Sequence, residues 1–121
     1  MTLQECYEAI GGSYEDVSGR LRKEALIRKF VLKFLDDPSY DTLCQAMESK
    51  NQEEAFRAAH TLKGVCQNLA FSRLYESSRD FTEQLRPGQD MQQVDAALFA
   101  RLKEDYRRTA DAIRLLDPAE A

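Results

Sequence analysis

A chain of 121 residues is long enough to form one compact domain with a buried core and no disulfide bonds. Its net charge of −4 argues against a general nucleic-acid-binding protein, which normally has a basic surface, and no apolar run approaches the ~20 residues that cross a bilayer. Three scattered cysteines form no metal-binding pattern and the first residues form no signal segment, so we expect a cytoplasmic protein without a metal or cofactor.

The first third of the chain predicts short helices followed by one longer helix. Thr2 and Glu5 form a capping box that begins a short helix ending before Gly11-Gly12. Ser13 can begin a short turn or helix. From about Leu21 to Leu35, apolar residues recur at helical spacing, and the basic residues among them are expected to face solvent.

The rest of the chain predicts four more helical segments. They cover residues 39–49, 52–70 and 72–85, with a last helix capped by Asp90 and Gln93 and running to Leu116. Short connections favour an all-α fold, namely an antiparallel four-helix bundle with a short additional N-terminal helix, in a single domain over residues 1–121. The apolar stripe of the last helix would also suit a coiled-coil dimer, although core packing is its commoner use.

His60 is the only histidine of the chain and lies in the predicted helix over residues 52–70. On a helical wheel it falls about 160° from Leu62, the centre of the apolar stripe. A histidine that served the core would share that stripe, so we expect His60 to face solvent. The residues expected on the buried side are Ala55, Ala58, Ala59, Leu62, Val65, Cys66 and Leu69.

The neighbours of His60 on this helix give it space and positive charge. Gly64 follows one turn later, and a glycine inside a helix costs roughly 1 kcal/mol relative to alanine, so its absent side chain suggests clearance for a partner protein. Arg57 and Lys63 stand three residues before and after His60, where they can stabilise a phosphoryl group. The candidate partner-binding residues on this side are Phe56, Arg57, Gln67 and Phe71.

The segment His60-Thr61-Leu62-Lys63-Gly64 resembles the motif of histidine-containing phosphotransfer (HPt) domains, His-x-Leu-Lys-Gly. Ala58-Ala59 before it and Asn68-Leu69 after it continue the resemblance. So do the upstream helix, which ends in VLKFL over residues 31–35, and the amphipathic helix that carries Leu74. The resemblance extends over most of the chain and implies a helical bundle.

The resemblance also implies a role for each motif residue. His60 would be the phosphoryl acceptor, Lys63 would stabilise its charge, and Gly64 would open the site to a partner. In several family members a glutamine 22 residues after the histidine orients the imidazole; here that position is Thr82, which becomes the candidate for this orienting role. Ala70 stands where the family more often has glycine.

The function implied by the resemblance is that of a phosphorelay intermediate. His60 would receive a phosphoryl group from a receiver-domain phosphoaspartate and pass it to another response regulator, the partners being receiver domains of response regulators and of hybrid sensor kinases. We expect no autonomous kinase activity, because the chain has no Gly-rich phosphate-binding loop. The alternative is a non-phosphorylated helical docking or inhibitory module for signalling proteins.

Three other functional interpretations of His60 fit the sequence poorly. The dimerisation helix of a sensor kinase typically has an acidic residue after its histidine, whereas Thr61 follows here. A Cys–His hydrolase needs a thiol beside the imidazole, but Cys66 is expected on the buried side. A zinc site lacks ligands.

Overall fold

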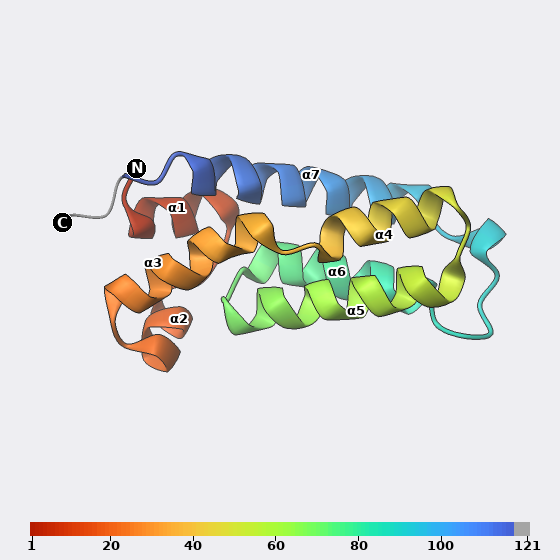
Figure 1. Cartoon of the computed structure of the whole chain (residues 1–121), viewed down its shortest axis with the longest axis horizontal. Helices are drawn as coiled ribbons and strands as arrows, with labels where there is room; N and C mark the ends of the chain where they lie inside the picture. The colour runs from red at the N-terminus through yellow and green to blue at the C-terminus, as the bar shows by residue number, and fades with distance from the viewer. Residues whose placement is uncertain (118–121) are drawn as a thin grey trace.

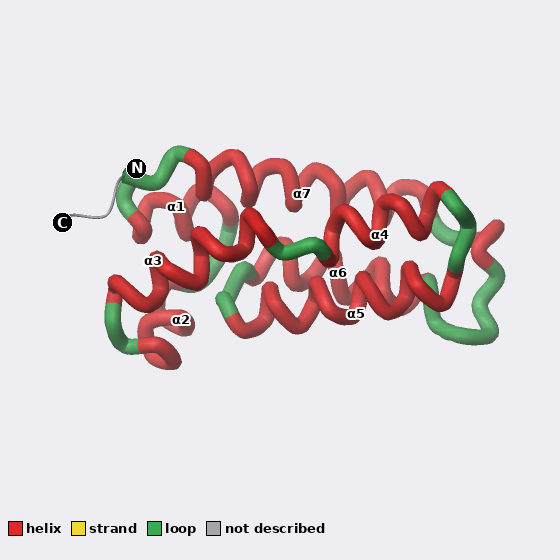
Figure 2. Tube along the Cα trace, in the orientation of Figure 1, coloured by secondary structure: helices red, strands yellow, loops and turns green. Residues whose placement is uncertain are grey.

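The computed structural model describes residues 1–117, and every regular element within them is helical (Figures 1 and 2). The α-helices are α1 (Leu3–Ile10), α2 (Tyr14–Leu21), α3 (Glu24–Lys33), α4 (Ser39–Glu48), α5 (Gln52–Asn68), α6 (Ser72–Gln84) and α7 (Ala96–Arg114). Two 3₁₀ turns, η1 (Phe34–Asp36) and η2 (Met91–Gln93), lie between α3 and α4 and between α6 and α7. In residues 1–117 no helix is both long and apolar enough to cross a membrane.

Helices α4, α5, α6 and α7 pack side by side as an antiparallel four-helix bundle (Figure 1). Each packs against the next in chain order, and the rings of Tyr40 on α4 and Tyr106 on α7 stack with centroids 3.7 Å apart, which closes the ring of helices. The predicted all-α bundle is therefore confirmed.

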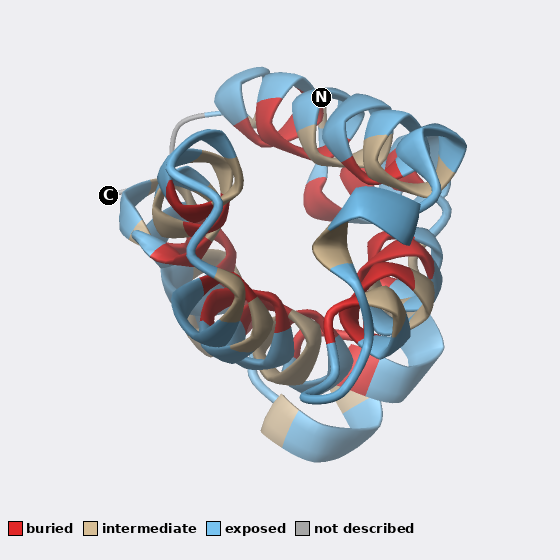
Figure 3. Ribbon diagram, turned by 90° about the vertical axis from the view of Figure 1, so that its right-hand side faces the viewer, coloured by how far each residue is buried: buried red, intermediate tan, exposed pale blue. Residues whose placement is uncertain are grey.

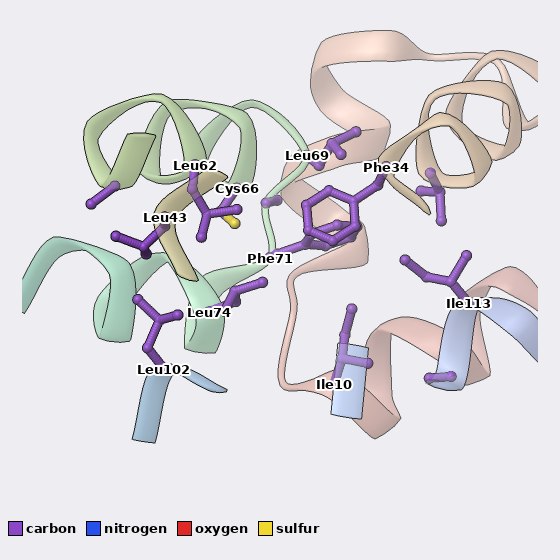
Figure 4. Close-up of a cluster of buried hydrophobic side chains, with 14 of the residues drawn as sticks. Ile10, Phe34, Leu43, Leu62, Cys66, Leu69, Phe71, Leu74, Leu102 and Ile113 are labelled. Carbon is purple, nitrogen blue, oxygen red and sulfur yellow. The ribbon is translucent and has the colours of Figure 1, made fainter. Parts of the chain in front are cut away.

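The helices turn their apolar sides inward, as the view along the bundle shows (Figure 3). One part of the core lies among the four bundle helices and the other lies where the N-terminal elements meet α7 (Figure 4). Labelled members of the first part are Leu43, Leu62, Cys66, Leu74 and Leu102, and of the second Ile10, Phe34, Leu69, Phe71 and Ile113. Burial of such side chains stabilises the fold by about 1.5–3 kcal/mol each.

The N-terminal helix α1 packs on α7 and is fixed by its caps. The predicted capping box is confirmed, because the Glu5 N–H donates to the Thr2 hydroxyl at 3.1 Å and the Thr2 N–H donates to the Glu5 carboxylate at 2.8 Å. Next to the Gly11 cap, Gly12 lies so close to its neighbours that an added Cβ would come within 2.9 Å of the Ala70 carbonyl oxygen and of the Tyr7 ring. The chain enters α2 by this close contact with the end of α5.

Two predicted helix boundaries are wrong. The helix expected from Leu21 begins at Glu24, because the chain turns at Arg22, where φ is +63°. The last helix begins at Ala96 rather than near Asp90. Its N-cap is Asp95, whose carboxylate accepts from the Ala97 N–H at 2.9 Å, whereas Asp90 caps only the short η2 turn.

Candidate functional site

Helix α5 carries the histidine motif and is fixed by polar contacts at both ends. The Glu54 N–H donates to the Asn51 side-chain oxygen at 3.1 Å, and acidic side chains fill the first turn, where the helix dipole favours negative charge. At the other end the Arg20 guanidinium of α2 donates to the backbone carbonyls of Gln67 and Asn68. The last carbonyls of a helix lack an intrahelical partner; here the Gln67 carbonyl also accepts from the Ala70 N–H at 3.1 Å, and α2 adds the Arg20 donor.

The two faces of α5 are divided as the helical wheel predicts. His60 is exposed, and the expected inner side chains are buried, with Val65 half-buried at their edge. Cys66 is fully buried, and that burial raises the pKa of its thiol. A buried, protonated thiol on the opposite side of the helix is no nucleophilic partner for His60, which excludes the Cys–His arrangement.

The imidazole of His60 lies at a surface hollow of about 660 Å³ between the first half of α5 and the turn after α6. Its nearest aromatic neighbour is Phe56, one turn earlier, with the two ring centroids 6.2 Å apart. The hollow is lined by Gln52, Glu53, Phe56, Arg57, His60, Leu85, Pro87 and Gly88. The imidazole of His60 makes no hydrogen bond to any other residue among 1–117 and is exposed, so its ring nitrogens are open to a partner.

Gly64 leaves open space one turn beyond His60. A Cβ added at this position would meet no other heavy atom within 4 Å, in contrast to the crowded Gly12. The glycine is therefore not required by packing within the domain. Its missing side chain leaves open surface one turn away from the imidazole.

Arg57 and Lys63 differ in how their charge is used. The Arg57 guanidinium pairs with Glu53 one turn earlier at 2.7 Å, and both side chains are largely exposed. The half-buried Lys63 has no carboxylate within 4 Å among the residues that the structure describes. It lies near enough to Glu83 on α6 to help lower the pKa of that carboxyl, although the hydrogen bond from Arg86 lowers it more.

Arg86 is a basic residue of this region that sequence reasoning missed. Its guanidinium forms two hydrogen bonds with Glu83, at 2.6 and 2.9 Å, and lies 5.7 Å from the centre of the Phe56 ring. It thus stands over the aromatic neighbour of His60. The sequence does contain an indication of this position. In an antiparallel helix pair, residues equally far along the chain from the connection face each other, and Phe56 on α5 and Arg86 after α6 are nearly equally far from Ala70.

Phe71 is not part of the exposed rim, which corrects the prediction from the wheel. It is fully buried, with its ring 5.1 Å from that of Phe34 and 5.6 Å from that of Tyr7. The helix ends before it, and Ala70 adopts a left-handed conformation with φ of +57°. That turn sends Phe71 inward, so the wheel of α5 does not apply to it.

Thr82 is also unsuited to the orienting role that the resemblance gives it. It is fully buried in α6, and its hydroxyl donates to the Ser78 carbonyl oxygen at 2.6 Å. Within residues 1–117 no hydrogen bond joins it to the exposed His60. The threonine side chain is shorter than the glutamine of other family members, and its hydroxyl already donates to a carbonyl of its own helix.

The remaining predicted residue, Gln67, is exposed two turns beyond His60 on the same side of α5. In the part of the chain that the structure describes, no group of three or more His, Cys, Asp or Glu side chains is placed to hold a metal ion. The site therefore consists of one open imidazole with basic and aromatic neighbours, which suits transfer of an anionic group between proteins.

Comparison with known families agrees with this geometry. The Hpt domain model matches residues 37–112, which contain His60 and extend from the end of η1 into α7. No curated protein and no solved structure gave a match. Hpt domains are phosphotransfer intermediates of two-component relays and interact with receiver domains of response regulators. With its four-helix bundle, its exposed histidine and a match over more than half of its length, the chain belongs to the Hpt domain family.

Proposed function

We propose that this domain accepts a phosphoryl group on Nε2 of His60 from the phosphoaspartate of one receiver domain and passes it to another. The observation that carries the proposal is the exposed imidazole beside Gly64, where even an added Cβ would touch nothing. The donor would be the receiver domain of a hybrid sensor kinase and the acceptor that of a response regulator.

In this transfer the reacting group that the chain supplies is a nucleophile. The Nε2 lone pair of the neutral imidazole attacks phosphorus, an N–P bond forms, and the P–O bond to aspartate breaks with its electron pair left on the carboxylate. Nδ1 keeps its proton during the attack. The return step reverses these bonds on the second receiver domain. Phosphoryl transfer depends mostly on positioning and charge stabilisation, and the receiver domain supplies the remaining catalytic groups.

The phosphoryl group on His60 is stabilised in this proposal by Lys63, with Arg86 as a second cation. Lys63 is supported by its place one turn from His60 and by the absence of a paired carboxylate within residues 1–117. Arg86 is supported by its position over the Phe56 ring, and its Nε and Nη2 would exchange their hydrogen bonds with Glu83 for bonds to phosphoryl oxygens. Cations placed beside a phosphoryl group form charge-assisted hydrogen bonds to its oxygens.

The docking surface is proposed to surround His60 on α5. Phe56 supplies an apolar contact at the hollow, and Arg57 and Gln67 flank it on the exposed side of the helix. Gly64 allows the partner backbone or side chains to reach the imidazole. Exposed residues on other helices serve as the matched controls for this surface.

The test is direct phosphorylation from a labelled receiver domain. The protein is incubated with a panel of receiver domains carrying radioactive phosphoaspartate, and label on the protein is expected to be acid-labile and alkali-stable. Because His60 is the only histidine, His60→Gln should abolish this label while circular dichroism shows an unchanged helical fold.

Two outcomes would contradict the proposal. Label that persists in His60→Gln would place the phosphoryl group on another residue. Failure of every receiver domain to label the wild-type protein would favour the docking or inhibitory module. Phosphoramidate, a small phosphoryl donor, tests the reactivity of the imidazole without a partner.

A further inference from the structure

Gln52, at the start of α5, binds the turn that follows α6. Its side-chain Nε2 lies 3.3, 3.0 and 2.8 Å from the carbonyl oxygens of Leu85, Arg86 and Gln89. An amide NH₂ group has two protons, so the three carbonyls share them in bifurcated hydrogen bonds. One side chain of α5 thereby gathers three backbone oxygens of a segment more than 30 residues away.

The segment that Gln52 binds, residues 85–89, forms one wall of the hollow at His60. Leu85, Pro87 and Gly88 line this hollow together with Gln52 itself. The same segment carries Arg86, whose guanidinium lies over Phe56. The shape of the hollow and the position of the Arg86 guanidinium over Phe56 therefore both depend on where this turn is held.

Little else holds the middle of the turn. Pro87 and Gly88 are exposed, and the Gln89 N–H donates back to the Arg86 carbonyl at 3.0 Å, a bond within the turn. Gly88 has a φ of +95°, a conformation that glycine adopts readily. The hydrogen bonds from Gln52 connect the exposed part of this loop, residues 86–89, to the helix that bears His60.

We propose that Gln52 is a positioning residue that holds the 85–89 turn as a wall of the hollow and thereby sets the fit of the receiver domain beside His60. The inference rests on the proposed function, because the hollow matters only if a receiver docks there. Gln52 acts through the turn and has no contact with the phosphoryl group.

The experiment compares three variants in a single-turnover assay. Phosphorylated protein is mixed with increasing amounts of the receiver domain that reacts fastest in the transfer test. Gln52→Met keeps the length of the side chain but removes its N–H donors. Gln52→Lys restores donors to the three carbonyls. Gln45→Met, on an exposed position of α4, is the matched control.

We expect Gln52→Met to raise the half-saturating receiver concentration about fivefold, or about 1 kcal/mol, with little change in the maximal transfer rate. Gln52→Lys should return the half-saturating concentration to within about twofold of wild type. Gln45→Met should match wild type. Phosphoramidate labelling of His60 should be unchanged in all three variants, because this small donor does not depend on the wall formed by residues 85–89. Hydrogen exchange at the Gln89 amide should be faster in Gln52→Met.

Each other result overturns the inference. Wild-type affinity in Gln52→Met despite faster exchange at Gln89 would show that the turn does not matter for docking. Unchanged exchange would show that Gln52 does not hold the turn. An equal loss of phosphoramidate labelling and receiver transfer would indicate general destabilisation. If wild-type protein transfers to no receiver, the proposed function itself fails, and the wild-type arm alone reveals this.

Discussion

The two faces of α5 use small residues for opposite purposes. On the inner face Ala55, Ala58 and Ala59 are buried, and their size lets α4 and α6 pack close to the helix. On the outer face Gly64 has nothing beside it, and its size keeps the surface beside His60 open. A small side chain on the inner face serves the stability of this domain, whereas on the outer face we propose that it serves a second protein.

The two faces of α5 therefore differ in which substitutions they tolerate. The inner face is close-packed, so a change of a single methylene group alters its packing energy. The outer face has free space in the isolated domain, so a substitution there changes stability little and is expected to be felt only in transfer. Substitutions on one face and matched substitutions on the other therefore test the assignment.

The largest expected effect on stability comes from Leu62→Ala on the inner face. Leu62 is fully buried at the centre of the stripe, and such a truncation leaves a cavity that costs about 3 kcal/mol. Urea unfolding followed by circular dichroism measures it. Thr61→Ala, its exposed neighbour, should cost less than about 0.5 kcal/mol. Equal losses in the two variants would contradict the division into faces.

On the outer face, Gly64→Gln should slow transfer from a receiver domain about tenfold, or about 1.4 kcal/mol, because the new side chain occupies the approach to His60. The folded protein should be at least as stable as wild type, since glycine is replaced by a better helix former. Gly19→Gln on α2 is the matched control, because an added Cβ there also meets nothing within 4 Å. If Gly64→Gln received the phosphoryl group at the wild-type rate, the proposal that Gly64 gives a partner access to His60 would be wrong.

Each of the two cations, Lys63 and Arg86, is expected to have a smaller effect than the open space at Gly64. Lys63→Ala and Arg86→Ala should each shorten the half-life of the phosphohistidine about fivefold, because a charge-assisted hydrogen bond to the phosphoryl group is lost. Decay of the label after removal of the donor measures this half-life. Arg101→Ala, whose guanidinium pairs with Asp80 at a different surface hollow from that of His60, should decay at the wild-type rate. A half-life in Arg86→Ala equal to that of the control would remove Arg86 from the site.

The smallest expected effect is on stability and concerns Ala70, in the turn that follows α5. Ala70→Gly should stabilise the fold by about 0.5 kcal/mol, because glycine adopts the left-handed conformation of this residue without the strain that a Cβ brings. Ala58→Gly, inside the helix, should have the opposite sign and cost about 1 kcal/mol or more. Thermal unfolding of the pair distinguishes the signs, and a destabilised Ala70→Gly would contradict the account of this turn.

The sequence by itself determined the helical class, the capping box at Thr2 and the exposure of His60. These features depend on local rules, namely the 3.6-residue period and the hydrogen bonds of a helix terminus, which act over a few neighbouring residues. The wheel of α5 was therefore reliable as far as α5 extends. The same wheel also places Gly64 on the outward side of the helix.

Only the tertiary structure decided the places of Phe71, Thr82, Arg86 and Gln52. The turn at Ala70 ends the wheel and sends Phe71 into the core, and the rotation of α6 about its axis buries Thr82. The register of α6 against α5 brings Arg86 over Phe56 and its backbone carbonyl to Gln52. Turn geometry and helix register arise from contacts between distant residues, which no local spacing in the sequence encodes.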